Sequence, residues 1–191
     1  MESILKNRTA YIALGGNEAS PVGPPDQTII AALAALVNES IRLSAVSRFF
    51  RTPAYPPGSG PEFVNAAASV TTALSPEALL NRLHAVEARF GRERHGRWSA
   101  RSLDLDLIGV DQDVFPDAAT VRSWIDLPPD RQRSETPTQL LLPHPRLQDR
   151  AFVLIPLAEI APAWRHPLTG KTVAQMAAAL SEAAKAAITP F

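Results

Sequence analysis

The order of strand-like and helix-like segments constrains the fold of this chain more than any other feature of its sequence. Four runs rich in apolar and β-branched residues are typical of strands, namely 9–14, 41–51, 63–72 and 103–110. One helical pattern follows the first run, with Asp26 as its expected N-cap, and another follows the third run at Ser75. The order strand, helix, strand, strand, helix, strand predicts an α+β fold, a ferredoxin-like sandwich in which helices flank an antiparallel β-sheet.

Proline and glycine mark the segments that interrupt this order. Loop 53–61 is so rich in both that neither a helix nor a central strand is expected there. The second helix ends at Gly91 and leads into an arginine-rich loop. Residues 111–142 have no regular period and are expected to form a surface insertion, with a short helix around Trp124. An alanine-rich terminal helix is expected at 173–186.

The composition of the chain fits one domain over residues 1–191. With 191 residues and 46% hydrophobic content, the chain can bury one substantial core but is short for two. Lys+Arg and Asp+Glu number 19 each, so no net charge attracts the chain to nucleic acid or to an anionic membrane. The sequence has no cysteine, no apolar run of membrane-spanning length and no signal sequence, so a cytoplasmic location is expected.

Arginines gather in one short stretch of the chain. They are Arg82, Arg89, Arg92, Arg94, Arg97 and Arg101. The planar guanidinium group suits phosphate oxygens, so the stretch is a candidate site for a polyanionic ligand. A solvated loop or a nucleic-acid-binding patch is the alternative interpretation.

Two aspartates alternate with leucines in the last strand. In Leu103-Asp104-Leu105-Asp106-Leu107, the leucines point to one face and both carboxylates to the other. A bound cation relieves the repulsion between such acids, and Mg²⁺ binds one or two carboxylates together with substrate phosphates. Ion pairs with Arg97 or Arg101 on a solvated face are the alternative. Beside the arginine cluster, the aspartates indicate transfer of a phosphate-containing group from a nucleotide.

Four separated stretches resemble one family in the same order along the chain. They are 11–17 (YIALGGN), 50–53 (FRTP), 97–106 (RWSARSLDLD) and 143–146 (PHPR). The common glycine-rich nucleotide-binding loops are missing, so a nucleotide must be held in another way. Over nearly the whole chain outside 111–142, the sequence closely resembles the 6-hydroxymethyl-7,8-dihydropterin pyrophosphokinases of folate biosynthesis.

The resemblance implies that the pyrophosphate group of ATP is transferred to the hydroxymethyl group of the pterin, with release of AMP. It assigns two Mg²⁺ ions to Asp104 and Asp106, and it makes Arg92 and Arg101 the arginines of a mobile catalytic loop. ATP binding is implied for His84, Glu87, Arg94, Arg97, Trp98, Arg101, His144 and Arg150. Pterin binding is implied for Thr52, Pro53, Ala54, Tyr55, Phe63, Asn65 and Phe152. The two phenylalanines are the expected partners of the pterin ring faces.

Other interpretations of the same residues stay open. Without the resemblance, Phe63 and Phe152 are typical core residues and His144 a packed loop histidine. A ferredoxin-like fold with a basic loop also suits an RNA-binding module without catalysis, in which the same two phenylalanines stack on bases. An ordinary γ-phosphate kinase or a phosphohydrolase is a third interpretation. No general base is evident.

The insertion at 111–142 is longer than the connection that is usual in the family. Its arginines Arg122, Arg131 and Arg133 suit additional phosphate contacts. A lid, a dimer contact or surface padding is equally compatible with its sequence. We expect ATP and the pterin as small-molecule partners, neither nucleic acid nor a membrane, and a monomer or a weak dimer.

Overall fold

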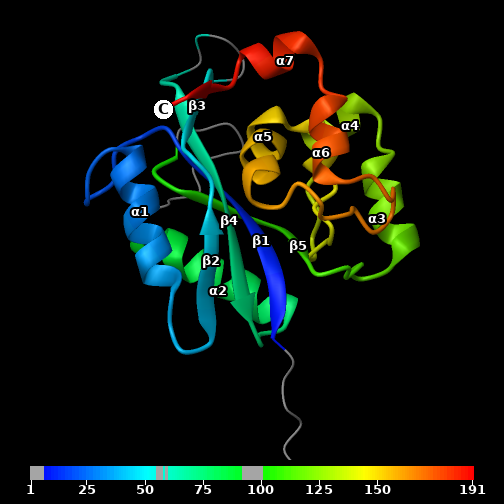
Figure 1. Cartoon of the computed structure of the whole chain (residues 1–191), viewed down its shortest axis with the longest axis horizontal. Coiled ribbons are helices and arrows are strands. Elements are labelled where there is room, and N and C mark those ends of the chain that lie inside the picture. Colours follow the sequence, from blue (N-terminus) through cyan, green and yellow to red (C-terminus); the bar gives the residue numbers. More distant parts are fainter. Residues whose placement is uncertain (1–6, 55–57, 59, 92–100) are drawn as a thin grey trace, which may run out of the picture.

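The computed structural model describes residues 7–54, 58, 60–91 and 101–191 (Figure 1). An antiparallel sheet is its central layer, with the strand order β5-β1-β4-β3-β6 and with β2 also paired to β4. These strands are β1 (Arg8–Gly16), β2 (Ile41–Val46), β3 (Phe50–Thr52), β4 (Phe63–Thr72), β5 (Asp104–Val110) and β6 (Thr189–Pro190). All described pairings are antiparallel, which confirms the predicted class of fold.

Helices cover both faces of the sheet. Helices α1 (Pro25–Leu36) and α2 (Pro76–Arg89) pack on one face, around a core that includes Ile12 and Leu105. Helices α5 (Ala151–Ile160) and α6 (Val173–Ala178) pack on the other, around Ile108 and Trp164. Figure 1 shows these two helical layers on either side of the strands.

Local sequence explains where α2 begins and ends. Ser75 is the N-cap, because its hydroxyl accepts a hydrogen bond from the Ala78 backbone N–H at 3.2 Å. Pro76 occupies the first helical position, as predicted. Gly91 follows the C-cap with φ +81°, a conformation that glycine adopts without strain.

Residues 111–142 contain two short helices, α3 (Ala118–Ile125) and α4 (Pro129–Ser134). The first confirms the helix predicted around Trp124. Its Val121 is fully buried, and Phe115 and Leu142 form an isolated β-bridge that closes the base of the segment. The interpretation of the chain as one domain with an insertion here stays a prediction.

The prediction of one strand over 41–51 is wrong, because the chain breaks between β2 and β3. The Ser47 N–H donates to the Ala67 carbonyl oxygen, while the Ser47 hydroxyl oxygen accepts from the Ala67 N–H. Both bonds are 2.9 Å long. A side chain therefore takes the place of a backbone acceptor, and the strand cannot continue regularly.

Two predictions about helices are also wrong. Asp26 lies in the first turn of α1 instead of capping it, since Pro25 already occupies a helical position. The single helix predicted at 173–186 is divided into α6 and α7 (Glu182–Ala186). The division occurs because the Ser181 hydroxyl accepts a bond from the Ala184 N–H at 3.2 Å and caps a new helix.

Candidate active site

Strand register gathers polar side chains at one end of the sheet. Gly15 of β1 pairs with Asn65 of β4 on one side and with Asp104 of β5 on the other. Ala13, two residues earlier, pairs with Asp106 and packs in the core under α5. Because side chains alternate along strands and paired residues share a face, Asn65, Asp104 and Asp106 all face the α5 side.

Each of the two aspartates has an arginine beside it. Arg101 Nη1 donates to Asp104 Oδ2 at 2.8 Å, and Arg150 Nη1 donates to Asp106 Oδ2 at 3.4 Å. The aspartate side chains are 23% and 37% exposed, respectively. The ion pair with Arg101, which was the alternative interpretation, is therefore present, and both aspartate side chains are partly exposed.

The backbone between the two aspartates is held by Glu87 of α2. Its buried carboxylate Oε1 accepts a hydrogen bond from the Leu105 N–H at 2.7 Å. A charge-assisted bond of this kind fixes β5 against α2. Glu87 and the half-buried His84 were predicted at the nucleotide, and that role stays a prediction.

Both aspartates suit magnesium, because hard carboxylate oxygens are the ligands it prefers. In the part of the chain that the structure describes, no group of three or more His, Cys, Asp or Glu side chains could hold a metal ion. Two carboxylates on one strand face match the ligand set that Mg²⁺ completes with phosphate oxygens and water.

Asn17, directly after the two glycines, positions Arg101. Its Oδ1 accepts from the Arg101 N–H at 2.8 Å, and its own N–H donates to the Arg101 carbonyl oxygen at 2.9 Å. Its Nδ2 donates to the Pro61 carbonyl oxygen at 3.2 Å. Asn17 is 6% exposed, so these bonds are shielded from water. The sequence interpretation used Asn17 only as part of a motif and missed this role.

The described residues of the predicted pterin site lie around the end of β3 and the start of β4. Thr52 pairs with Phe63 in the strand register, and the buried Asn65 donates through Nδ2 to the Thr52 hydroxyl at 2.8 Å. Ala54 is buried and Pro53 exposed. Phe152, in the first turn of α5, is 38% exposed, with the Arg150 guanidinium 5.7 Å from its ring centroid.

His144 sits in the loop that precedes α5. Its Nδ1 accepts from the Arg146 N–H at 3.0 Å, and its backbone N–H donates to the Ile108 carbonyl oxygen at 2.8 Å. Burial lowers the pKa of His144 to about 3, with the Arg150 charge as the next cause. The imidazole is therefore neutral at pH 7 and can donate from Nε2.

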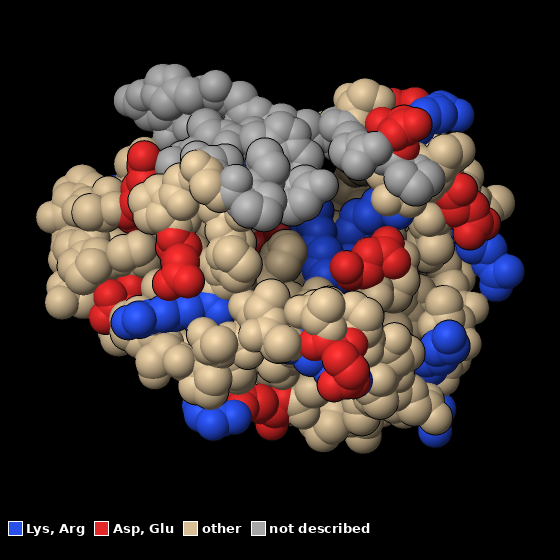
Figure 2. Space-filling model, turned by 90° about the horizontal axis from the view of Figure 1, so that it is seen from above, with Lys and Arg blue, Asp and Glu red and all other residues tan. Residues whose placement is uncertain are grey.

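A cavity of about 370 Å³ joins several of these residues. Arg101, Asp106, His144 and Arg150 line it, and Leu80 of α2 and Leu140 add apolar wall. Trp124 lies in the wall as well, so the segment predicted as a surface insertion reaches the cavity. Seen from above, the molecule has basic side chains gathered in a hollow beside acidic ones (Figure 2).

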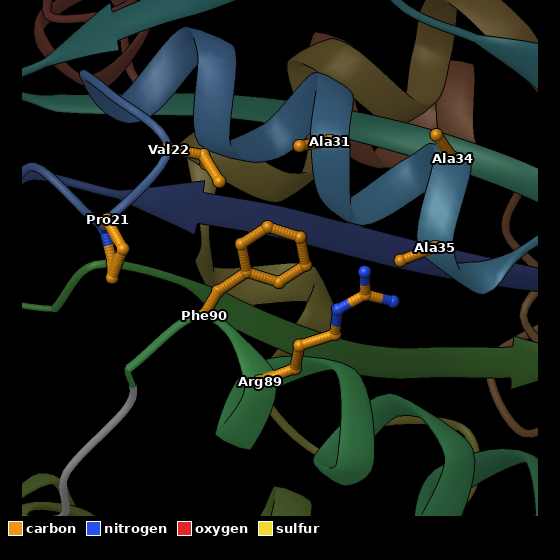
Figure 3. Close-up of a pocket in the computed structure, with 7 residues that line it drawn as sticks. All are labelled: Pro21, Val22, Ala31, Ala34, Ala35, Arg89 and Phe90. Carbon is orange, nitrogen blue, oxygen red and sulfur yellow. The ribbon is translucent and has the colours of Figure 1, made fainter.

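A second cavity, of about 430 Å³, lies between α1 and the end of α2. Small apolar side chains of α1 and the Phe90 ring line most of it, and Arg89 is its charged residue (Figure 3). Among the described residues that line it, none has a carboxylate, amide or hydroxyl side chain. This cavity is similar in size to the first, but it offers little chemistry for orienting a polar substrate.

Five predicted site residues lie outside the described part of the chain. They are Tyr55, Arg92, Arg94, Arg97 and Trp98. Their predicted roles stay predictions.

None of the described helices has the length and apolar character that crossing a membrane requires.

Comparison with known proteins gives consistent results. Residues 11–162 match the family model described as 7,8-dihydro-6-hydroxymethylpterin-pyrophosphokinase. The chain is 37% identical over 168 residues to the 2-amino-4-hydroxy-6-hydroxymethyldihydropteridine pyrophosphokinase of Synechocystis, covering 87% of this chain and 73% of that protein. It is 38% identical over 158 residues to the Pseudomonas aeruginosa protein of the same name, covering 82% and 83%.

Solved structures support the same assignment of fold. Wild-type Plasmodium falciparum HPPK-DHPS with pteroate aligns with a TM-score of 0.63 and 13% identity. The alignment covers 93% of this chain but 43% of that one, so this chain spans less than half of the Plasmodium protein. With the match to the family model and the identity to the bacterial relatives, the chain belongs to the 7,8-dihydro-6-hydroxymethylpterin pyrophosphokinase family, whose members are diphosphotransferases.

Proposed function

We propose that this chain transfers the β,γ-pyrophosphate group of ATP to the hydroxymethyl oxygen of 6-hydroxymethyl-7,8-dihydropterin and releases AMP. One observation carries the proposal: Gly15 pairs with Asn65 on one side and with Asp104 on the other. A group suited to the edge of a heterocycle and a group suited to a metal-bound phosphate thus face the same side of the sheet. Membership of the family supports this class of reaction.

The pterin would bind beside β3 and β4. Asn65 is held by its bond to the Thr52 hydroxyl, so its amide is preorganised for hydrogen bonds to the ring edge. Phe63 and the exposed Phe152 would supply the aromatic faces between which a flat heterocycle stacks. These contacts orient the hydroxymethyl group toward the two aspartates.

The triphosphate would bind at Asp104 and Asp106, which would hold two Mg²⁺ ions. When bound, these ions would neutralise phosphate charge and align the β-phosphorus for attack. Arg101 and Arg150 lie beside the aspartates and would contact phosphate oxygens directly. Neutral His144 would donate a further hydrogen bond to the triphosphate from Nε2. Arg92 is proposed as the second arginine that stabilises the developing charge.

The step is a displacement at phosphorus. The hydroxymethyl oxygen forms a bond to the β-phosphorus, and the bond from that phosphorus to the α,β-bridging oxygen breaks. AMP leaves with the bridging oxygen, and the hydroxyl proton is released to solvent. Arg101 would stabilise the charge that develops on the transferred group, as positioned cations do in phosphoryl transfer.

The proposal is tested by following nucleotide products with Mg²⁺, ATP and 6-hydroxymethyl-7,8-dihydropterin. We expect AMP to form only when all three are present. Asp106→Asn should lower the rate at least about a hundredfold, because it removes a metal-ligand charge. Asp113→Asn is the matched control, since Asp113 is 36% exposed and is paired with Arg8 outside the site.

Other products would support other functions. ADP formation would indicate a γ-phosphate kinase, and free phosphate a phosphohydrolase. Salt-sensitive RNA binding without nucleotide turnover would favour the RNA-binding module. Normal AMP formation by Asp106→Asn would contradict the proposed metal site even if the reaction itself were correct.

A further inference from the structure

The segment 118–136, called the α3–α4 segment below, forms part of the wall of the 370 Å³ cavity. Trp124, Gln132, Glu135 and Thr136 from this segment line the cavity that Arg101 and Asp106 also line. The segment therefore shares a single space with the residues proposed to bind the triphosphate. A segment that only covered the surface would not line this cavity.

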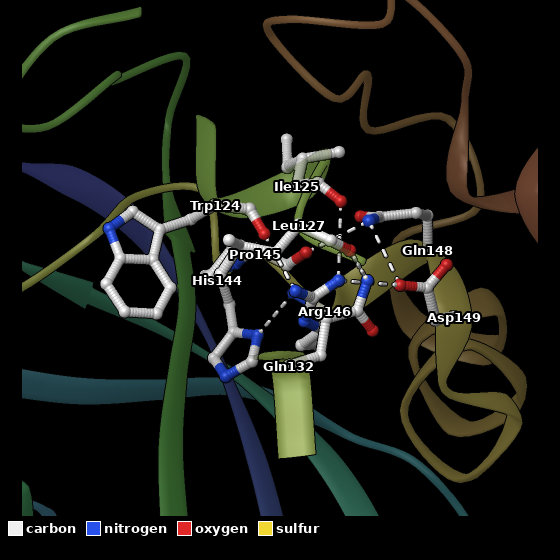
Figure 4. A network of polar contacts seen from close by, with 9 residues as sticks. All are labelled: Trp124, Ile125, Leu127, Gln132, His144, Pro145, Arg146, Gln148 and Asp149. Carbon is white, nitrogen blue, oxygen red and sulfur yellow. Dashed lines mark hydrogen bonds and ion pairs between the residues drawn. The ribbon is translucent and has the colours of Figure 1, made fainter. Parts of the chain in front are cut away.

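The α3–α4 segment is fastened beside the cavity by Arg146. Its Nη2 donates to the Trp124 carbonyl oxygen at 2.7 Å, and its Nη1 donates to the Ile125 carbonyl oxygen at 3.4 Å (Figure 4). Asp149 accepts from the same Nη1 at 3.4 Å. The Arg146 side chain is 14% exposed. Burying a cation without hydrogen-bond partners is costly. Arg146 instead donates to carbonyl groups at the end of a helix, so this contact holds the segment in place.

The charges of the segment do not suit a second phosphate site. Its described arginines Arg122 and Arg131 are exposed, and neither lines the cavity. Arg131 is instead paired with Glu135. The prediction that these two arginines supplement phosphate binding thus finds no support in the cavity wall.

The side chains that do line the cavity divide it by chemistry. Arg101, Arg150 and Asp106 supply charge, whereas Trp124, Leu80 and Leu140 supply flat or apolar surface. Two further charged residues of the lining are bonded within the protein, Arg146 to the Trp124 carbonyl oxygen and Glu135 to Arg131. A nucleoside triphosphate has the same division, since its phosphates require cations and its base presents two apolar ring faces. Stacking on an aromatic side chain is a strong, geometry-tolerant way to hold a base.

We propose that the α3–α4 segment is the base-binding wall of the nucleotide site, resting on the function proposed above. The Trp124 ring packs against the purine of ATP. Arg146 is a positioning residue that holds the backbone of Trp124 and does not itself contact the nucleotide. The role of the insertion is thus to select and orient the base while the aspartates and arginines hold the phosphates.

The test compares two probes, both with Mg²⁺, by titration calorimetry of the full chain. One is α,β-methylene-ATP, which carries the base and cannot be cleaved between its α- and β-phosphorus atoms. The other is inorganic tripolyphosphate, which lacks the base. Trp124→Ala should weaken the nucleotide analogue about tenfold or more and leave tripolyphosphate unchanged, because base stacking alone is lost. Trp124→Phe should retain most of the affinity.

Arg146 is tested by a double-mutant cycle. Arg146→Ala should weaken the analogue but not tripolyphosphate, and Trp124→Ala added to it should cost far less than in the wild type. A merely structural role would lower the affinity for both probes and show no such coupling. Arg122→Ala, an exposed change in the same segment, should bind both probes like the wild type.

Each outcome has one meaning. Unchanged affinity of Trp124→Ala for the analogue, or equal losses for both probes, would overturn the base-wall proposal. The wild type could bind the analogue and yet form no AMP from ATP and the pterin. The proposed reaction would then be wrong, whereas a loss of analogue affinity in Trp124→Ala would still support the base-binding wall. Wild-type protein that binds neither probe would overturn both proposals.

Discussion

Gly15 is where the two proposed substrate sites meet, and its missing side chain matters. A Cβ built there would lie 2.8 Å from Asn65 Oδ1 and 3.9 Å from the Val64 carbonyl oxygen. The first distance is shorter than real Cβ contacts allow, so Asn65 would have to move. The bond from Asn65 to Thr52 resists that movement, because it would be lost.

Gly15→Ala should therefore raise KM for the pterin about tenfold, while the affinity for α,β-methylene-ATP changes little. Steady-state kinetics and calorimetry measure the two effects. Gly109→Ala is the matched control, since its Cβ would lie 2.8 Å from the Trp164 ring, outside the proposed sites. That variant should lose stability without a selective change in pterin KM. Equal changes in both substrates for Gly15→Ala would contradict the assignment of Asn65.

Arg101 combines a structural backbone with a functional side chain. Its peptide groups are bonded to Asn17, so the loop should stay in place when the side chain is removed. Arg101→Ala should lower kcat about a hundredfold and weaken ATP binding much less, because the charge acts mainly in the transition state. Single-turnover kinetics and nucleotide titration separate the effects. Equal losses in kcat and affinity would argue against a transition-state role.

Among the structural elements, two turns are each closed by hydrogen bonds to a histidine side chain, His144 in one and His166 in the other. His166 is fully buried, and its Nδ1 accepts from the Leu168 and Thr169 N–H groups at 3.2 and 3.3 Å. Burial lowers the pKa of His166, as it does that of His144. Protonation at Nδ1 would remove the acceptor that closes each turn.

The free energy of unfolding should therefore fall as the pH falls below about 6.5. In that range both histidines bind a proton in the unfolded chain but not in the folded chain, so acid favours unfolding. For His144 the loss of folding stability continues toward pH 3. His144 contributes at most about 1.4 kcal/mol per pH unit, and His166 adds a loss of the same sign. Urea unfolding between pH 7.5 and 5 measures this slope. His166→Asn keeps an acceptor near the Nδ1 position and should have a shallower slope; identical slopes would contradict the role of His166.

Sequence patterns predict elements well where local residues decide them. The apolar and β-branched run 63–72 and the Ser75-Pro76 signal predict the bounds of β4 and the start of α2, and the structure confirms both. The break after β2 depends on a bond between Ser47 and Ala67, two residues that are distant in sequence. No local pattern records such a partner, so a single strand was predicted.

The same distinction applies to the site. The common face of Asp104 and Asp106 follows from their spacing alone, because strand side chains alternate. The approach of Asn65 to them depends on two strand pairings with β1. The place of Trp124 depends on Arg146, which is 22 residues away in sequence. Neither of these last two could be derived from residue periodicity.

At the scale of the whole molecule, local charge outweighs net charge. The chain has a formal net charge of zero, yet Arg101 and Arg150, both proposed to contact phosphate, line one cavity. Long-range attraction to a polyanion such as RNA is therefore weak, whereas a small phosphate ligand meets concentrated positive charge.

Ligand binding should accordingly stabilise the fold in a metal-dependent way. At about a hundred times its Kd, α,β-methylene-ATP with Mg²⁺ should add about 2.7 kcal/mol and raise Tm by about 5 to 10 °C. EDTA should abolish most of the rise, and single-stranded RNA should produce none. Thermal unfolding curves measure all three conditions. A rise with RNA but not with the nucleotide would favour the RNA-binding module.

The pairing of β1 with β4 and β5 also restricts how the gene can change in length. A residue inserted or deleted within β1 would turn every later side chain of that strand to the opposite face of the sheet. It would also shift the register of the pairing with β4 and β5 by one residue. Loops carry no such register and can change in length more freely. Viable length variants should therefore be confined to the connections, and a library of single-codon insertions should tolerate none inside β1.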